Sequence, residues 1–329
     1  MKRPYPGMSP LVTLLTGYLD NVGRVPVAQA THADIERTRR TVHPTHPPFS
    51  WVTGGLVPGV RISEGSAPGH AGATLALRWY TPAQGPAGLP LIVFFHGGGW
   101  VQGSTRMYDP LCTFVAAGVE AVVVSVDYRL APEHRAPTAA LDAIEVTRWL
   151  AGQDAAHDTS RIAVAGDSAG GNLAAVVAQQ LRDLRVDGRP ALRHQALIYP
   201  GTDMTLSSPS IREHAHGAVL DEANIHAFRR LYLGDGPGAL DPTDPLVSPL
   251  FGDLVGVAPA LVQTADLDPI RDDGLRYAHA LEEAGVPVRS TNYVGLPHGF
   301  ANFPGVAPAG AQHRAELVGQ LRRHLAGDS

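Results

Sequence analysis

The pattern of apolar and polar residues divides the chain into two parts that meet near residue 57. In the first part, apolar residues recur at helical spacing over residues 11–18, and a weaker helical pattern covers about residues 27–40. Prolines and histidines then crowd residues 43–48, which excludes a helix and predicts a linker. In the second part, short apolar strands alternate with helical segments, which is typical of a sheet covered by helices on both faces.

This second part predicts a series of strands and helices. An antiparallel pair of strands comes first, joined by a turn rich in glycine and proline, and six shorter apolar strands follow. The strands are predicted at residues 56–62, 74–80, 91–95, 121–127, 161–165, 195–199, 260–264 and 288–293. The helices between them are predicted at residues 108–117, 137–151, 169–187, 271–284 and 311–325. Gly188 and Gly285 fall where helix C-caps are expected.

One stretch of about 60 residues, between residues 199 and 260, interrupts the alternation. It contains a single clear helix, at about residues 221–233, within loops that are dense in Pro, Gly, Ser and Asp. A connection of this length inside a compact domain is typical of an insertion over an active site.

The first candidate for chemistry is the segment Gly166-Asp167-Ser168-Ala169-Gly170, which matches the G-x-S-x-G pattern. It directly follows an apolar strand and opens an alanine-rich helix. A nucleophilic serine on such a sharp, strained turn stands clear of the sheet, and the flanking glycines let the backbones approach each other. Ser168 is therefore the candidate nucleophile.

A run of glycines follows another strand, in the segment His96-Gly97-Gly98-Gly99-Trp100. Consecutive glycines expose backbone N–H groups with no Cβ to block a ligand, as acyl transfer requires for a developing oxyanion. A phosphate-binding turn is the alternative, but the chain has neither G-x-G-x-x-G nor a lysine-bearing P-loop. The run therefore predicts an oxyanion loop.

A serine nucleophile needs a base, and the base needs an acid that orients it. In a fold of this kind they follow in the chain order Ser, Asp, His, each on a loop after a strand. His298 follows the last predicted strand in a tight turn flanked by glycines, which makes it the candidate base. The candidate acids follow the preceding strand and are Asp266, Asp268, Asp272 and Asp273. Position favours Asp268, just past the strand end and fixed by Pro269, without excluding Asp266.

Composition narrows the function classes. Of the 329 residues, 44% are apolar and 17% charged, with a formal net charge of −5, so no basic face for nucleic acid or membrane is indicated. Cys112 is the only cysteine, which excludes an intramolecular disulfide and a multi-cysteine metal site, and its apolar neighbours predict a buried side chain. Lys2 is the only lysine, which argues against Schiff-base chemistry. No apolar run approaches the roughly 18 residues of a membrane span, so a cytoplasmic protein is expected.

Taken together, the motifs resemble those of the bacterial hormone-sensitive-lipase-like esterases of the α/β-hydrolase superfamily. The shared segments occur in the order and approximate spacing of that family, and are HGGGW (96–100), DYRLAPEH (127–134), GDSAGGNLA (166–174), DPIRDDG (268–274) and HGF (298–300). The resemblance implies an α/β-hydrolase fold, with a mostly parallel eight-stranded sheet flanked by helices, in residues 51–329. It also implies a helical cap formed by residues 1–50 and an insertion at about residues 201–235.

The resemblance further implies roles for individual residues. Ser168 would be the nucleophile, Asp268 the acid and His298 the base, which resolves the choice among the aspartates. The oxyanion donors would be the backbone N–H groups of Gly98, Gly99 and Ala169. The segment DYRLAPEH would brace the oxyanion loop rather than take part in the chemistry.

The implied function is hydrolysis of short- to medium-chain acyl esters through an acyl-enzyme, with neither a metal nor an organic cofactor. One alternative is an amidase, lactonase or deacetylase that uses the same triad. Another is a ligand-binding receptor that has lost the chemistry. Plant relatives that act as receptors lack the catalytic histidine, so His298, the rest of the triad and the glycines of the oxyanion loop argue against this alternative.

The expected partner is a small-molecule ester, with no nucleic acid and no stable membrane insertion. The chain is expected to be a monomer or a homodimer, in which the strand nearest the C-terminus offers an edge for pairing. The residues that could line a pocket or pack in the core are Phe49, Trp51, Trp100 and Leu206.

Overall fold

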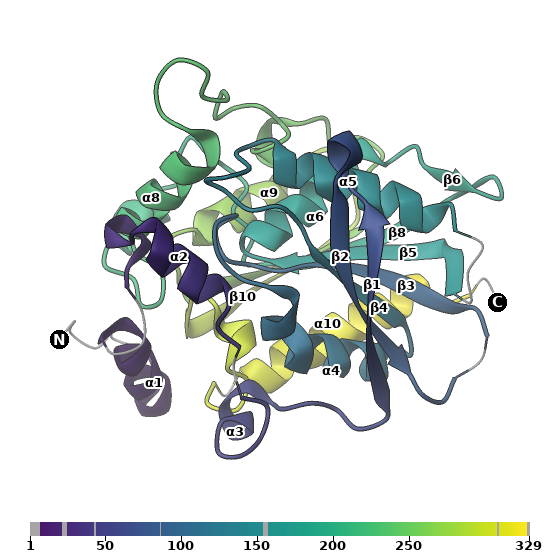
Figure 1. Ribbon diagram of the computed structural model, residues 1–329, viewed down its shortest axis with the longest axis horizontal. Helices are drawn as coiled ribbons and strands as arrows, with labels where there is room; N and C mark the ends of the chain where they lie inside the picture. The colour runs from purple at the N-terminus through teal and green to yellow at the C-terminus, as the bar shows by residue number, and fades with distance from the viewer. Residues whose placement is uncertain are drawn as a thin grey trace.

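An eight-stranded sheet runs through the centre of the molecule, with helices on both of its faces (Figure 1). This computed structural model describes residues 7–21, 25–42, 44–85, 87–153, 157–307 and 309–327. Lys2 and the first residue of the predicted linker, His43, lie outside these ranges.

The sheet is mostly parallel. Its strands are β1 (Val60–Pro68), β2 (Thr74–Pro82), β3 (Leu89–Phe95), β4 (Val122–Asp127), β5 (His157–Asp167), β8 (Leu192–Ile198), β9 (Ala260–Leu267) and β10 (Val288–Pro297). They lie in the order β1-β2-β4-β3-β5-β8-β9-β10. Only β2 pairs antiparallel with its neighbours, β1 and β4, among the strand pairs of the described sheet. The predicted α/β-hydrolase sheet is therefore confirmed.

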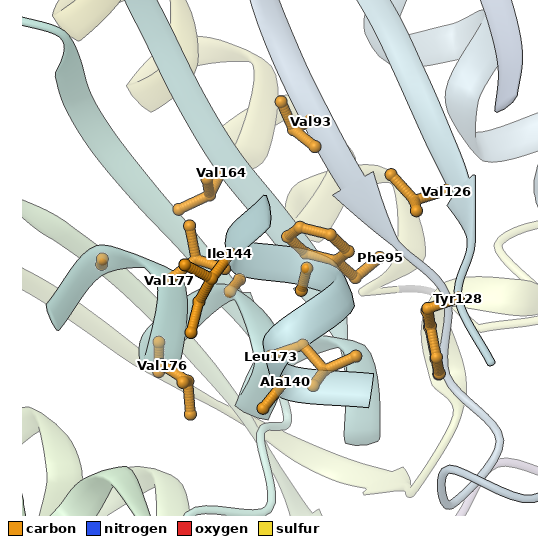
Figure 2. Packing of buried hydrophobic residues seen from close by; sticks show 14 of the residues in the cluster. Val93, Phe95, Val126, Tyr128, Ala140, Ile144, Val164, Leu173, Val176 and Val177 are labelled. Atoms are coloured by element: carbon orange, nitrogen blue, oxygen red, sulfur yellow. The ribbon is translucent and has the colours of Figure 1, made fainter. Parts of the chain in front are cut away.

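Helices cover both faces, which explains why the central strands are continuously apolar. One face carries α5 (Thr138–Ala151), α6 (Ala169–Gln180) and α9 (Arg271–Glu283), and the other carries α4 (Asp109–Val119) and α10 (Gly310–Leu325). Successive side chains of a strand point to opposite faces. In β3, Val93 and Phe95 therefore join the core beneath α5 and α6 (Figure 2), whereas Phe94 joins the other core.

The segments that precede the sheet and interrupt it are built from short elements. The N-terminal segment contains α1 (Pro10–Asn21), η1 (Val27–Gln29), α2 (His32–Arg39) and α3 (Ser50–Thr53). The insertion between β8 and β9 contains α7 (Ser210–Glu213), α8 (Glu222–Leu233) and η4 (Pro249–Phe251). The remaining elements are η2 (His70–Gly72), η3 (Thr105–Tyr108), β6 (Arg185–Val186), β7 (Arg189–Pro190) and η5 (Phe300–Asn302). None of the helices in the described ranges is long and apolar enough to cross a bilayer.

The N-terminal segment and the insertion lie side by side, although about 200 residues separate them along the chain (Figure 1). The N–H of Ala28 donates to Oδ1 of Asn224 at 3.2 Å, and the N–H of Val219 donates to Oδ1 of Asp20 at 3.1 Å. Each bond joins a helix or loop of one segment to the other, so the two segments are in direct contact at two places.

Several predicted boundaries were wrong. The helix predicted at residues 169–187 ends at Gln180, and a hairpin of β6 and β7 follows it. Asp187 and Gly188, with φ angles of 50° and 75°, form the turn of that hairpin, so Gly188 is not a helix C-cap. Asp-Gly is a strong hairpin signal that the helical reading overlooked. Gly285 does follow its helix, α9, with a φ of 77°, as predicted.

The first strand and the second N-terminal helix also differ from their predictions. β1 begins at Val60 rather than residue 56 and continues to Pro68. The pattern at residues 27–40 divides into η1 and α2, because Thr31 adopts an extended conformation and caps α2. Its hydroxyl accepts the N–H of Asp34, whose carboxylate accepts the N–H of Thr31 in return, a capping box that fixes the start of the helix.

Candidate active site

Ser168 occupies a sharp turn between β5 and α6. Its φ and ψ angles are 53° and −117°, which are strained for any residue with a side chain. The positions two residues before and two residues after the serine must be glycine, because neither has room for a side chain. A Cβ on Gly166 would overlap the backbone of Gly170, and a Cβ on Gly170 would overlap the carbonyl of Phe95. The spacing of the motif therefore lets three backbone segments meet beneath the serine.

The three candidate triad residues lie in hydrogen-bonding contact. Nε2 of His298 is 2.9 Å from Oγ of Ser168, and Nδ1 of His298 is 2.7 Å from Oδ2 of Asp268. Asp268 is fully buried, and its Oδ1 accepts the N–H of Ile270 at 2.9 Å. With its proton on Nδ1, the imidazole donates to Asp268 and leaves Nε2 free to accept the serine proton. The strands β5, β9 and β10 bring these residues together because their carboxyl ends meet at one edge of the sheet.

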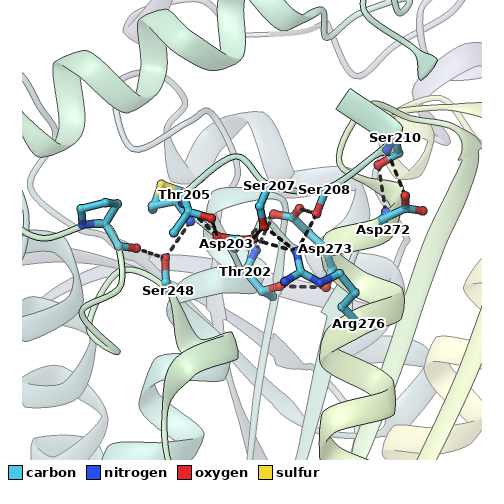
Figure 3. A network of polar contacts seen from close by, with 12 residues as sticks. Thr202, Asp203, Thr205, Ser207, Ser208, Ser210, Ser248, Asp272, Asp273 and Arg276 are labelled. Carbon is cyan, nitrogen blue, oxygen red and sulfur yellow. Dashed lines mark hydrogen bonds and ion pairs between the residues drawn. The ribbon is translucent and has the colours of Figure 1, made fainter. Parts of the chain in front are cut away.

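The other candidate acids have different partners. Oδ2 of Asp266 accepts the N–H of Gly295 at 3.3 Å. Asp272 accepts the N–H of Ser210 at 2.9 Å, and Asp273 accepts the N–H groups of Thr202 and Asp203 at 3.0 and 3.1 Å (Figure 3). The geometry therefore singles out Asp268 among the four.

Asp272 and Asp273 instead hold the start of the insertion against α9. Asp273 also accepts the hydroxyl proton of Ser208, and Arg276 donates to Asp203 at 2.7 Å (Figure 3). Burial raises the pKa of Asp273 to about 7, because the loss of hydration outweighs the hydrogen bonds it accepts. The sequence named these two residues only as candidate acids, whereas in the structure they anchor the insertion.

The glycine run forms a tight turn beside the serine. Gly98, Gly99 and Trp100 all have positive φ angles, of 126°, 62° and 60°. The carbonyl of Gly98 accepts the N–H groups of Val101 and Gln102 at 3.2 and 2.9 Å, which closes the turn. A Cβ on Gly98 would overlap the carbonyl of Gln102, so the turn requires glycine there.

Ala169, the third candidate donor, is the first residue of α6, and only 1% of its surface is exposed. The first N–H groups of a helix have no partner within the helix, and the helix dipole favours negative charge near them. A developing oxyanion beside Ser168 would therefore be favoured at this helix end.

Asp167 ties the serine turn to the glycine run. Its Oδ1 accepts the N–H of Gly97 at 2.7 Å, and its Oδ2 accepts the hydroxyl protons of Tyr108 and Tyr199 at 3.0 and 3.3 Å. Burial is the largest influence on this carboxyl and raises its pKa to about 6 against the hydrogen bonds that lower it. Asp167 was not among the predicted site residues, although it is the variable position next to the nucleophile.

The segment DYRLAPEH lies against the same loop. The hydroxyl of Tyr128 donates to the carbonyl of His96 at 2.7 Å, and the two rings stack with their centroids 4.5 Å apart. The N–H of Ala131 donates to the carbonyl of Trp100 at 2.9 Å. This segment therefore braces the glycine run, which is the candidate oxyanion loop.

The insertion covers the loops on both sides of the serine. The ring of Phe228, in α8, lies against Gly99, and the ring of Tyr232 stacks on Trp100 with centroids 4.6 Å apart. On the other side, a Cβ on Gly299 would lie 3.4 Å from the side chain of Val219. No local sequence signal identified Phe228, Tyr232 or Val219, because their contacts depend on how the insertion folds back.

The residues proposed from the sequence for a pocket fall into two groups. Trp100 is buried beneath Tyr232, and Leu206 is half-buried in a small apolar cluster that includes Phe228. Phe49 and Trp51 are 50% and 71% exposed, which does not fit the wall of an enclosed pocket. Aromatic character alone misled the prediction, because these two residues lie at the surface around α3.

Within the described ranges, one group of three side chains has the spacing of metal ligands: His32, Glu36 and Glu133. It lies at the surface, and both carboxylate oxygens of Glu133 already accept hydrogen bonds from Arg39. This group therefore does not fit a resident metal site.

Comparisons with known proteins show which families and structures this chain resembles. A model of the α/β hydrolase fold family matches residues 92–302. Carboxylesterase NlhH of Mycobacterium tuberculosis is 44% identical over 279 residues, which cover 82% of this chain and 85% of that protein. Ethyl acetate hydrolase of Pseudomonas putida is 37% identical, over 80% of this chain and 83% of that protein. The structure of a hyperthermophilic esterase from Pyrobaculum calidifontis superposes with a TM-score of 0.81 at 34% identity, covering 97% and 99% of the two chains.

Proposed function

The chain belongs to the hormone-sensitive-lipase-like carboxylesterases of the α/β-hydrolase superfamily, and from its site we propose that Ser168, Asp268 and His298 are the catalytic triad of this serine ester hydrolase. The observation that carries the proposal is the unbroken chain of contacts from Asp268 through His298 to Ser168, at 2.7 and 2.9 Å. In this arrangement Asp268 can orient His298, and His298 can take the hydroxyl proton of Ser168, as acyl transfer requires.

The first half of the reaction acylates the serine. Oγ of Ser168 attacks the ester carbonyl carbon while Nε2 of His298 takes the hydroxyl proton, and the carbonyl electron pair moves onto oxygen. The carbonyl then re-forms, the bond to the leaving alcohol breaks, and His298 gives the alcohol oxygen its proton. The product is an acyl-enzyme on Ser168.

The second half repeats these steps with water. His298 takes a proton from water as the water oxygen attacks the acyl carbon, and then returns a proton to Oγ of Ser168 as the acid leaves. Asp268 is buried against Nδ1 of His298 and accepts its proton in a hydrogen bond, so it orients the imidazole and stabilises the imidazolium that forms in each half.

We assign the oxyanion hole to the backbone N–H groups of Gly98, Gly99 and Ala169. The positive φ angles of both glycines and the position of Ala169 at the start of α6 support this assignment. Each such donor contributes on the order of 3 kcal/mol to stabilising the transition state.

We also propose that residues 1–50 and 201–235 form a cap over a catalytic domain of residues 51–329. The hydrogen bonds of Ala28 and Val219 that join the two segments, and the contact of Phe228 with Gly99, support this division. A cap that approaches the oxyanion loop so closely favours short to medium acyl chains, and a relative named for hydrolysis of ethyl acetate points the same way. The proposed substrate is accordingly a small ester.

The oligomeric state is proposed to be a monomer or a homodimer. β10 is the outermost strand at one end of the sheet, so one of its edges is available for pairing with a second copy. Light scattering during gel filtration distinguishes the two states.

The test of the proposed function is hydrolysis of p-nitrophenyl esters from acetate to palmitate. We expect wild-type activity to peak at short or medium chains and Ser168→Ala to lose at least about 1,000-fold in kcat while its circular dichroism stays unchanged. Ser290→Ala, an exposed serine on β10, is the matched control and should keep full activity. Retention of more than a few per cent of activity by Ser168→Ala would show that Ser168 is not the nucleophile.

Matched amides and lactones belong in the same assay. Ester hydrolysis should exceed amide hydrolysis for the same acyl group, because an alcohol is the better leaving group. Faster turnover of the amide or lactone would mean that the proposed substrate class is wrong, whereas the proposed triad would still stand.

A further inference from the structure

Arg39, the last residue of α2, reaches from the N-terminal segment to two separate stretches of backbone. Its Nε donates to the carbonyl of Val101 at 2.8 Å, and its Nη2 donates to the carbonyl of Ala131 at 2.6 Å. The remaining bonds go to the carboxylate of Glu133, at 2.9 and 2.8 Å. Four of the five N–H groups of the guanidinium are therefore used, and its side chain is only 20% exposed.

The two carbonyls belong to the framework of the oxyanion loop. Val101 ends the turn, since its N–H donates to the carbonyl of Gly98 at 3.2 Å. Ala131 lies in the bracing segment and donates its N–H to the carbonyl of Trp100 at 2.9 Å. Arg39 thus holds the carbonyl of a residue that closes the turn and the carbonyl of a residue that braces it, one bond to each.

α2 is itself fixed in place, so it can hold the guanidinium steady. The capping box of Thr31 and Asp34 secures its first turn. Ile35 is only 3% exposed and belongs to the large core beneath α5 and α6. Movement of α2 relative to the sheet would therefore pull Arg39 away from the loop.

We propose that Arg39 is a positioning residue for the oxyanion hole, and that docking of α2 sets the place of the Gly98 and Gly99 N–H groups. This inference rests on the proposed function. Oxyanion donors work only within about 2.7–3.1 Å of the oxygen, and a shift of about 1 Å can cost on the order of 100-fold in rate. The N-terminal segment is then part of the apparatus that stabilises the transition state, and not only a cover.

Arginine is suited to this task for a geometric reason. Its planar fork meets two carbonyls and a carboxylate at once, whereas the ammonium of lysine is a single point on a flexible stem. The pair with Glu133 by itself is a partly exposed ion pair, which generally contributes little. Loss of the carbonyl bonds, rather than loss of the ion pair, should therefore decide the effect of a substitution.

The experiment compares four variants of the full chain: Arg39→Ala, Arg39→Lys, Glu133→Gln and Arg37→Ala. Arg37, on the same helix, is 74% exposed, and its guanidinium donates to Asp34 at 3.0 Å and not to the loop, so its variant is the matched control. Each variant is assayed for kcat/KM on p-nitrophenyl butyrate. Each is also titrated with a trifluoromethyl ketone, which forms an oxyanion on the serine, and with the corresponding alcohol, which cannot.

We expect Arg39→Ala to lower kcat/KM by about 10- to 100-fold and to weaken the ketone by a similar factor, while the alcohol binds within about twofold of wild type. Arg39→Lys should recover only part of the loss, and Glu133→Gln should lose no more than about threefold. Added guanidinium ion should raise the activity of Arg39→Ala but not that of wild type. Arg37→Ala should match wild type.

Two results would overturn the inference. One is kcat/KM of both Arg39 variants within about twofold of wild type. The other is an equal loss of affinity for the ketone and the alcohol, which indicates general damage to the site. If Arg39→Ala does not fold, Arg39→Lys supplies the same comparison. Wild type and Ser168→Ala in the same assay test the proposed function separately, since its failure appears there as an inactive wild type or an active serine variant.

Discussion

The ring of Phe228 lies directly on the backbone of Gly99, where any side chain would overlap it. The insertion therefore contacts the proposed oxyanion loop at a glycine, which presents only backbone atoms. Gly99 also has a φ of 62°, which disfavours an L side chain. The absence of a Cβ at this position serves both the turn and the packing of α8.

Gly99→Ala is expected to lower kcat/KM by about 10²- to 10³-fold, because the methyl group displaces Phe228 and strains the turn that carries the oxyanion donors. The double variant Gly99→Ala/Phe228→Ala should recover part of this loss, since the overlap is gone and only the strain remains. Gly98→Ala should not be recovered by any such change, because its Cβ meets the carbonyl of Gln102 instead of a side chain. Steady-state kinetics of the four proteins tests this, and no recovery in the double variant would contradict it.

Asp268→Asn is expected to reduce kcat by about 10⁴-fold, because an amide next to Nδ1 favours the wrong tautomer of His298. Asp266→Asn provides a matched control two residues away, where the carboxylate accepts a long bond of 3.3 Å from the N–H of Gly295. It should retain most of the activity. Comparable losses in the two variants would show that the assignment of the acid is wrong.

The sequence predicted those parts of the molecule that depend on short, local patterns. Each core strand is a continuous apolar run because both faces of the sheet are covered, so its position could be found without knowing its neighbours. Ser168 and His298 each follow such a strand within a glycine-flanked turn, and Asp268 follows another, so strand ends pointed to all three. The choice between Asp268 and Asp266 needed either the family resemblance or the contact with His298.

Other features depend on contacts between distant segments and left no local trace. Phe228 and Val219 reach the oxyanion and histidine loops only because the insertion folds back over the sheet. Arg39 meets Val101 because the N-terminal segment folds against the same loop, across 62 residues of chain. Gly188 shows a different failure, in which a helical pattern was extended through an Asp-Gly turn that should have ended it.

His194 is expected to make stability depend on pH. It is fully buried in β8 and stacks on His324 at 4.3 Å. Burial, aided by His324, lowers its pKa to about 3, whereas an unfolded histidine has a pKa of about 6.5. Between these values the unfolded chain binds more protons, so the free energy of unfolding falls as pH falls through this window.

His194→Phe keeps an aromatic ring but cannot take up a proton. From pH 7 to pH 5, its free energy of unfolding should therefore fall by about 2 kcal/mol less than that of wild type. His279→Gln, at a position that is 70% exposed, should leave the pH dependence as it is. Urea unfolding at several pH values measures the difference, and parallel curves for wild type and His194→Phe would refute the role of this residue.

Cys112 is expected to report on unfolding. It is 1% exposed within α4, and burial raises the pKa of its thiol well above the ordinary value. Ellman's reagent should therefore leave the native protein untouched and titrate a single thiol in concentrated urea. Rapid reaction of the native protein would mean that α4 opens readily.

On one half of the sheet, the spatial order β3-β5-β8-β9-β10 is also the order along the chain. His298 follows the outermost of these strands, 130 residues after the serine it contacts. A ribosome therefore produces the nucleophile and the glycine turn long before it produces the base, and the base arrives only when the final strand has docked. A growing chain carries an inert serine until then, so ester hydrolysis begins only after the last strand of the sheet has docked.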